Sequence, residues 1–286
     1  MCSPEIAKVV SARIASEGLP KFTRRNLLKM GGSAAAGLAF ASFASPARRA
    51  AAHGDTGFEV VDLSHVFGPN MPVYTLGEEP TRETYLSVEE NGYFIQYWTL
   101  YEHVGTHCDF PAHFVADGET VDNYDAAHLA SRAVVINIAE KAAADPNAML
   151  EVADIEAWEA ANGEIPEGAV VFMNSGWASR WPTDDYRNAD ADGVQNYPGF
   201  SGEAVAWLIE NRAINGIGVD TLSLDPGNST TFDAHYAVCG GGIYGVENAA
   251  NLDALEGAAN AIVVIGIPRW EGSGGGPTRV LALIGS

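Results

Sequence analysis

The sequence predicts a mixed α/β fold, a single domain built on a mixed sheet with few helices. Short apolar runs rich in valine and isoleucine recur along the chain, as buried strands do. Clear helical periodicity is found in only two segments. Because strands outnumber helices, a mixed sheet is favoured over a doubly wound one.

Seven segments are expected to form strands, at residues 58–66, 93–101, 133–138, 169–174, 216–220, 261–267 and 279–284. A helix is expected over 152–162, where Ile155 and Trp158 share one face. A second is expected over 201–212, with Ser201 as the capping residue. Residues 252–255 form a short third candidate. The acidic stretch 183–197 is interpreted as a solvated loop, with an active-site lid as the alternative.

Composition excludes several classes of function. The chain carries a formal net charge of −21, so nucleic acid, whose phosphates require a basic surface, is not an expected partner. Three cysteines suggest neither a disulfide framework nor a zinc knuckle. No glycine-rich nucleotide-binding motif follows a predicted strand.

The first 52 residues differ from the rest. Arg24 and Arg25 form a twin-arginine pattern, and a small-residue apolar run and alanines that suit a cleavage site follow. The run is shorter than the ~20 residues of a membrane span, which favours an export signal over an anchor. We therefore expect a signal over 1–52 and one catalytic domain over 53–286. The expected location is periplasmic or extracellular, with no membrane contact after cleavage.

Removing residues 1–52 makes the chain more acidic. Residues 53–286 hold eight basic and 35 acidic side chains, a formal net charge of −27, and Lys141 is their one lysine. Self-repulsion of such a surface is best tolerated where salt screens it. A high-salt habitat and an ordinary acidic exported protein are both compatible with this composition.

The segment HVGTHCDFPAH is the most informative in the chain. It places four polar side chains at odd-numbered positions: His103, His107, Asp109 and His113. In an extended strand these would point to the same face. Imidazole and carboxylate are ligands of Zn²⁺, Mn²⁺ and Fe²⁺, and burying four such groups without a partner would be costly. We therefore expect metal binding or acid–base chemistry.

Two other interpretations of this segment are weaker. An HExxH metalloprotease helix would need glutamate where Val104 stands, and Pro111 follows soon after. Cys108 would face the opposite side of a strand from the histidines, so it is interpreted as a small buried hydrophobic residue.

Residues 103–114 match the pattern HxGTHxDxPxHF without a break, and this pattern resembles that of the metal-dependent cyclase-like hydrolases. That family includes kynurenine formamidase and isatin hydrolase. The segments DLSH at 62–65, SGW at 175–177, GVDTLSLD at 218–225 and GPTR at 276–279 are similar to further family motifs. The resemblance implies the family's swivelling β/β/α fold over most of residues 58–286.

The resemblance also implies residue roles. His103, His107 and Asp109 would bind one metal ion, and Asp109, His235 and Glu247 a second, with Asp109 bridging. Isatin hydrolase resembles this scheme with one manganese, so one or two ions per chain, Zn²⁺ or Mn²⁺, are implied. His113 would be the general acid/base rather than a ligand. Without the family, His235 could equally be structural, and Glu247 would be a weaker candidate still.

The implied reaction is hydrolysis of a small amide by metal-bound hydroxide, with His113 carrying the proton. Arylformamide cleavage, as on N-formylkynurenine, is the first expectation, with an isatin-type cyclic amide, imide or lactone as the alternative. A non-catalytic exported metal-binding protein is the alternative from another class. The family implies a homodimer or homotetramer. Phe67, Tyr101 and Trp177 are weak candidates for an aromatic substrate pocket, with burial in the core favoured on general grounds.

The family comparison also shows a departure. The segment after the first strand normally contains a PGD-like turn, whereas this chain has TLGE at 75–78. The implied export likewise differs from the cytoplasmic location usual for kynurenine formamidases. The first difference lies in a region that shapes the pocket and so bears on substrate identity, and the second argues against a housekeeping step of tryptophan breakdown.

Overall fold

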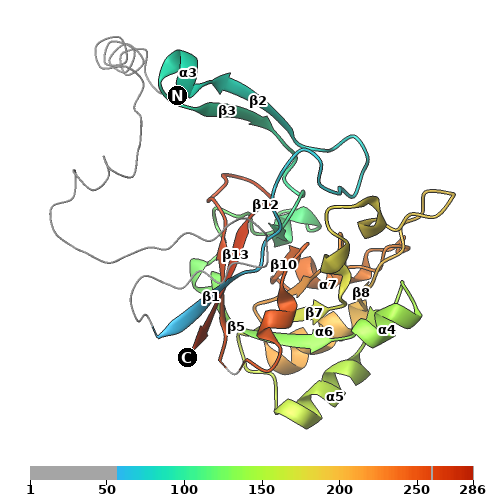
Figure 1. The fold of residues 1–286 in the computed structure, drawn as a ribbon. Helices are drawn as coiled ribbons and strands as arrows, with labels where there is room; N and C mark the ends of the chain where they lie inside the picture. The colour runs from blue at the N-terminus through green and yellow to red at the C-terminus, as the bar shows by residue number, and fades with distance from the viewer. Residues whose placement is uncertain (1–56, 259, 286) are drawn as a thin grey trace, which may run out of the picture. The chain divides into compact units, whose positions relative to one another are not determined.

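The computed structural model describes residues 57–258 and 260–285 (Figure 1). The expected signal at 1–52 lies outside the described residues. Contacts within the chain separate residues 81–99 from the remainder, so the two parts are described in turn. None of the described helices combines the length and hydropathy that a membrane span requires.

The main part is organised around a nine-stranded mixed sheet, as the sequence predicts. Its strand order is β1-β13-β11-β5-β7-β9-β10-β4-β12. The four central strands run parallel: β5 (Ala130–Asn137), β7 (Val170–Asn174), β9 (Gly216–Val219) and β10 (Tyr244–Glu247). Antiparallel strands extend it on both sides: β1 (Phe58–Asp62), β13 (Arg279–Gly285) and β11 (Ile262–Gly266), and then β4 (His107–Asp109) and β12 (Gly275–Pro277).

Helices cover one face of the parallel strands. They are α4 (Ala139–Ala144), α5 (Val152–Asn162), α6 (Gly202–Arg212) and α7 (Asp233–Gly240). Side chains of α5, α6 and α7 share one hydrophobic cluster with β5, β7 and β9. The predicted bounds of the two long helices are confirmed. Ser201 caps α6 by accepting a hydrogen bond from Ala204 N, and Glu151 and Asp154 form a capping box on α5.

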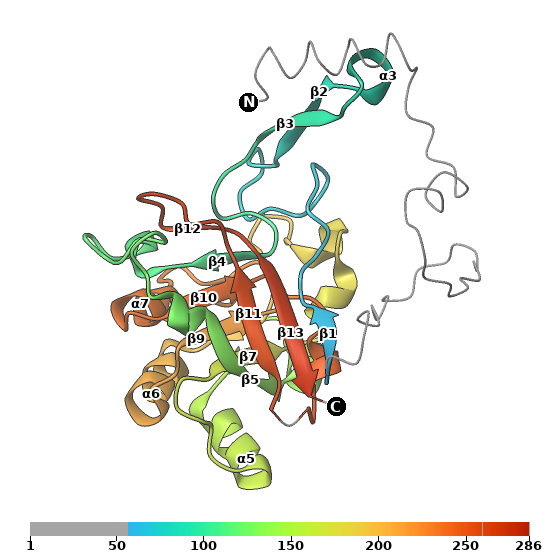
Figure 2. The ribbon, with the colours of Figure 1, turned by 90° about the vertical axis from the view of Figure 1, so that its left-hand side faces the viewer.

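The other face is covered by the sheet itself. Residues of β1, β11 and β13 share a second hydrophobic cluster with β7, β10 and Cys108 of β4, so the sheet curls over its own face (Figure 2). Cys108 is fully buried there, as expected of a small hydrophobic residue. β6 (Met149–Leu150) and β8 (Gly199–Phe200) pair in a separate two-stranded sheet. This sheet adjoins the N-terminus of α6, because Ser201 N donates a hydrogen bond to Leu150 O.

Residues 81–99 form a hairpin of their own. β2 (Thr81–Leu86) pairs antiparallel with β3 (Ile95–Thr99), and the register shifts between Thr84 and Leu86. The connection contains α3 (Val88–Asn91), which Ser87 caps at its start and Gly92 ends with φ 81°. The strand expected at 93–101 is confirmed over its centre; its partner was not predicted.

The acidic stretch 183–197 is less solvated than a plain loop. It contains a short 3₁₀ helix at Asp184–Tyr186, and both Tyr186 and Tyr197 are buried with Trp177 and Leu222. The sequence pattern could not show this, because two tyrosines among many polar residues carry no periodicity.

His65 provides a test of stability against pH. Its ring stacks on Trp181 at 4.3 Å, its Nε2 is buried without a hydrogen-bond partner, and burial lowers its pKa to about 4. The unfolded chain therefore takes up a proton near pH 6.5 that the folded chain resists until about pH 4. Between these values stability falls as pH falls, by up to about 3 kcal/mol. His65→Phe should lose less stability over this window in urea unfolding; an unchanged pH dependence would contradict the assignment.

Candidate metal centre

His107 and Asp109 are placed by β4, a strand of three residues. β4 pairs antiparallel with β10 in a register that sets His107 opposite Glu247. As a result His107 Nε2 lies 3.3 Å from Glu247 Oε2 and 3.4 Å from Asp109 Oδ1. All three side chains are buried. The register of one strand pair thus joins residues that are far apart in sequence.

His103 reaches the same carboxylate from the preceding loop. Its Nδ1 lies 2.6 Å from Asp109 Oδ1. The loop turns at Gly105, which has φ 64° and packs so closely that an added Cβ would lie 2.8 Å from the Phe67 ring. On the other side, a Cβ on Gly275 of β12 would lie 2.5 Å from His103 Cε1. Glycine at 275 thus makes room for the His103 ring, and glycine at 105 makes room for the Phe67 ring behind the loop.

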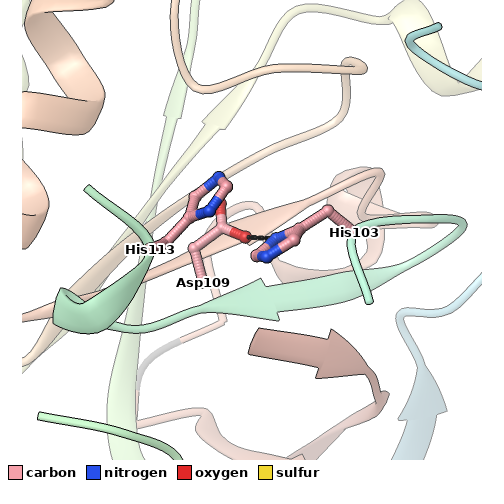
Figure 3. Close-up of side chains that lie close together, drawn as sticks. All are labelled: His103, Asp109 and His113. Carbon is pink, nitrogen blue, oxygen red and sulfur yellow. Dashed lines mark hydrogen bonds and ion pairs between the residues drawn. The ribbon is translucent and has the colours of Figure 1, made fainter. Parts of the chain in front are cut away.

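His113 approaches from the opposite end of β4. It ends the 3₁₀ turn Pro111–His113, and its ring stacks on that of His103 at 3.7 Å with an interplanar angle of 18°. Figure 3 shows both rings close to the Asp109 carboxylate, with a dashed line joining Asp109 to His103. Burial, opposed in part by Asp109, lowers the pKa of His113 to about 4. The imidazole is therefore neutral at pH 7 and able to accept a proton.

The prediction that His103, His107, Asp109 and His113 all project from one face of a strand is wrong. β4 covers only residues 107–109, so alternation holds for His107 and Asp109 alone. His103 precedes the strand, and His113 lies in a 3₁₀ turn that Pro111 begins. The four side chains still converge, because the loops at both ends of the strand fold back towards Asp109.

His235 joins the cluster from α7. Its Nε2 lies 3.2 Å from Glu247 Oε1 and 3.7 Å from Asp109 Oδ2. Its Nδ1 lies 2.6 Å from Asp225 Oδ2. Leu224 N donates a hydrogen bond to Glu247 Oε1 and so holds this carboxylate in place. The two remote residues implied by the family resemblance therefore lie beside the local motif.

Hydrogen bonds fix which nitrogen two of the imidazoles present. His107 Nδ1 lies 2.8 Å from Gly105 O, a carbonyl that can only accept, so Nδ1 carries the proton. His235 Nδ1 likewise donates to the Asp225 carboxylate. In the neutral ring each Nε2 is then a lone-pair donor facing the two buried carboxylates, which is the tautomer that a metal ligand needs.

Charge in the cluster favours a cation. Burial acts to raise the pKa of Asp109, but His107 and His103 outweigh it and hold that pKa well below its usual range. Burial acts to lower the pKa of His235, but Asp225 and Glu247 raise it to about 10. His235, and His107, whose pKa is also raised, thus hold protons that balance the two buried carboxylates. A divalent ion can supply this positive charge instead.

The donor set and one unpartnered atom fit a metal ion. Asp109 Oδ2 is fully buried and makes no hydrogen bond. Ligand atoms within 4.8 Å of one another form two groups: His103, Asp109 and His113, and His107, Asp109 and Glu247. Asp109 belongs to both, as a bridging ligand would. The first group includes His113, so the assignment of His113 as proton carrier instead of ligand stays a prediction.

The three aromatic pocket candidates lie in different environments. Trp177 is 2% exposed and belongs to a hydrophobic cluster with Tyr186 and Tyr197. It is therefore a core residue, the alternative to lining a substrate pocket. Phe67 packs against Met71, Val73 and Val104. Tyr101 is 59% exposed. Trp177 therefore does not face solvent, whereas Tyr101 does.

Asp225 was missed as a site residue. It accepts hydrogen bonds from His235 Nδ1 and from the backbone N–H groups of Ala234 and His235. It lies in the segment GVDTLSLD, so the signal was present, but spacing alone cannot show that a carboxylate touches a histidine ten residues on. Its position orients His235 towards Asp109 and Glu247.

Replacing Asp225 should weaken metal binding. Asp225→Asn removes the charge that holds the His235 ring, and we expect a loss of about 10–100-fold in affinity for Mn²⁺ or Zn²⁺, measured by calorimetric titration. Asp220→Asn is the matched control. Asp220 is equally buried and accepts hydrogen bonds from Ser175 and Trp177, and within the described residues its side chain hydrogen-bonds to no member of the cluster. Equal affinities in the two variants would contradict the role of Asp225.

Comparison with known proteins agrees with these features. The family model described as "Putative cyclase" matches residues 61–226. Isatin hydrolase of Roseibium aggregatum is 33% identical over 79% of this chain and 92% of its own length. Kynurenine formamidase of Erythrobacter litoralis is 27% identical over 62% of this chain and 72% of its own.

Solved structures show the same likeness. Isatin hydrolase A from Labrenzia aggregata bound to benzyl benzoate has a TM-score of 0.75 at 32% identity, covering 80% of this chain and 95% of that one. Isatin hydrolase A from Ralstonia solanacearum has a TM-score of 0.74 at 30% identity, covering 79% and 92%. The mixed α/β fold with few helices matches that of the cyclase structures. The chain belongs to the cyclase-like family of metal-dependent hydrolases.

Proposed function

We propose that this protein hydrolyses the carbon–nitrogen bond of a small cyclic amide of the isatin type. The observation that carries the reaction class is the pair of buried carboxylates, Asp109 and Glu247, surrounded by imidazoles and holding an unpartnered oxygen. The cyclic amide is supported by the likeness to isatin hydrolase over most of both chains.

The residues that would hold the metal are His103, His107, Asp109, His235 and Glu247. A bound Zn²⁺ or Mn²⁺ ion would supply Lewis acidity, polarising the substrate carbonyl and making a neighbouring water molecule more acidic. We propose one or two ions per chain, since Asp109 belongs to both groups of ligand atoms.

His113 carries the proton in the proposed reaction. Its neutral ring accepts a proton from water as the water oxygen bonds to the carbonyl carbon. The protonated ring then returns that proton to the amide nitrogen as the carbon–nitrogen bond breaks. Since burial holds the pKa of His113 low, its protonated form is a stronger acid than a solvent-exposed imidazolium and donates more readily.

Arylformamide hydrolysis is the second candidate. It uses the same cluster and the same proton transfer, and the likeness to kynurenine formamidase favours it, although over a shorter match. Both candidates break a carbon–nitrogen bond outside a peptide.

An absorbance assay distinguishes the candidates. Protein loaded with Mn²⁺ or Zn²⁺ is incubated with isatin and, separately, with N-formylkynurenine. We expect ring opening of isatin. Turnover of N-formylkynurenine alone would favour the second candidate, and turnover of neither, with metal bound, would favour a non-catalytic metal-binding protein.

The proposed location follows from the twin-arginine pattern at Arg24 and Arg25. We propose export through the twin-arginine route, which carries folded proteins, to the periplasm or the exterior. Replacing both arginines with lysine should retain the protein in the cytoplasmic fraction of the host cell, as measured by immunoblotting of cell fractions.

A further inference from the structure

Arg187 is a half-buried cation without an anion. Its Nη2 donates to the backbone oxygen of Tyr74 at 3.3 Å, and its Nε is buried and donates to nothing. No carboxylate of residues 57–258 and 260–285 lies within 4 Å of its guanidinium. The two other half-buried arginines in this part of the chain are satisfied: Arg212 by Glu159, and Arg180 by stacking on Trp177.

Arg187 differs from Arg180, which also has no carboxylate partner, in having a buried N–H without any acceptor. With 37 acidic side chains against 16 basic ones, a carboxylate is the easiest partner to provide. A buried charge is normally paired, because leaving it unpaired costs free energy. The guanidinium fork matches a carboxylate geometrically, so a carboxylate from outside the chain is the partner that fits.

Two buried neighbours are also unsatisfied. Gln195 donates through Nε2 to the same Tyr74 oxygen at 2.9 Å, so its side chain lies beside that of Arg187. Its Oε1 has no donor, and the Tyr197 hydroxyl has no partner at all; these residues are 8% and 0% exposed. Arg187 Nε and the hydroxyl are available as donors to a carboxylate, and Gln195 Oε1 as an acceptor from a nearby N–H.

Two aromatic rings link the group to the candidate metal centre. The Tyr74 ring lies 6.4 Å from that of Phe232, which lies 5.9 Å from that of His235. Burial raises the pKa of Tyr197, and Tyr74, Glu247 and Asp225 add to it, whereas Arg187 acts in the opposite direction. The Tyr197 hydroxyl is thus within electrostatic reach of both the guanidinium and Glu247.

We propose that Arg187, Gln195 and Tyr197 form a subsite for the carboxylate of an aryl ligand that also carries an N–H group. The inference rests on the proposed function and deepens it, because it adds an anionic group to the small amide. Two sources share this chemistry: a carboxylate already present on the substrate, and the one that opening of a cyclic amide releases. The subsite would bind the former before cleavage, and the latter only once the product has left the metal centre, where its carboxylate forms.

Matched ligands test the subsite. N-formylanthranilate and its methyl ester differ in one negative charge, and so do anthranilate and methyl anthranilate. The metal-loaded protein should prefer the acid about tenfold over the ester, in kcat/KM for the first pair or in Kd for the second, as one charge-assisted hydrogen bond provides. Arg187→Gln should reduce that preference to near unity, and Arg187→Lys should restore part of it.

Arg180→Gln is the matched control, since Arg180 is also half buried but stacks on Trp177, and it should leave the preference intact. Tyr197→Phe keeps the ring and removes the hydroxyl, so it tests the subsite if Arg187→Gln does not fold. Hydrolysis of isatin identifies which of the two carboxylates the subsite binds. If the carboxylate is the one released, inhibition of isatin hydrolysis by the ring-opened product weakens in Arg187→Gln.

The outcomes separate the subsite from the reaction. An acid preference in binding that depends on Arg187 would support the subsite even if no amide were hydrolysed. Hydrolysis with no preference for the acid, or with the same preference and product inhibition in wild type and Arg187→Gln, would overturn the subsite and leave the proposed function standing. Equal losses for acid and ester in Arg187→Gln would also overturn it, because they indicate a structural role.

Discussion

Replacing His113 with alanine should abolish most hydrolysis while the metal content stays unchanged. The imidazole lies beside Asp109 and is neutral at pH 7, which suits a proton carrier. Loss of general acid–base catalysis typically costs about 10²–10⁴-fold in rate. Turnover of isatin and elemental analysis of the same preparation provide the two measurements.

The matched control for this variant is His128→Ala. His128 is exposed in the 3₁₀ turn Ala126–Leu129 and lies outside both groups of ligand atoms, so its loss should change neither quantity. If His113→Ala hydrolysed as fast as wild type, the proposed proton transfer would be wrong. If it lost metal as well as activity, His113 would be a ligand, as its position in the first group of ligand atoms allows.

Replacing Asp109 with asparagine should remove both metal and activity. Asp109 contributes to each group of ligand atoms and lies within 4 Å of three imidazoles. Its loss should therefore exceed the ~10–100-fold loss of metal affinity that removing an orienting partner causes. Calorimetric titration with Mn²⁺ and Zn²⁺ measures the affinity. Asp192→Asn, at an exposed position, is the control and should bind metal as wild type does.

An Asp109→Asn protein that still bound metal with unchanged affinity would place the metal elsewhere. Asparagine is nearly isosteric with aspartate, so we expect the variant to fold. Urea unfolding shows whether a loss of metal binding comes from a folding defect instead. Because the pKa of Asp109 is held well below its usual range by His107 and His103, the charge removed is present throughout the neutral range.

The fold was largely predictable because buried strands leave a local signature. The Val/Ile-rich runs at 133–138, 169–174 and 261–267 correspond to β5, β7 and β11 within a few residues. The helix at 152–162 was predicted with its observed bounds. The hairpin strand β2 (Thr81–Leu86) was missed, because its side chains are mostly exposed and polar and leave no apolar run.

The site was predictable only in part. The local motif shows His103 and His107, but the three-residue length of β4 depends on pairing with β10 and β12, which no local pattern reveals. α7 was missed because its eight residues end in a glycine-rich segment, so His235 was found only through the family resemblance. The roles of Arg187 and Asp225 depend on their burial, which the whole fold determines.

Metal dependence is the central claim, and a reconstitution titration tests it most directly. Protein stripped with a chelator is titrated with Mn²⁺ or Zn²⁺ while isatin hydrolysis and bound metal are recorded together. We predict no turnover in the stripped protein and a rise that saturates at one or two ions per chain, with no rise in Asp109→Asn. Full turnover by protein whose metal content is far below one ion per chain would contradict this account.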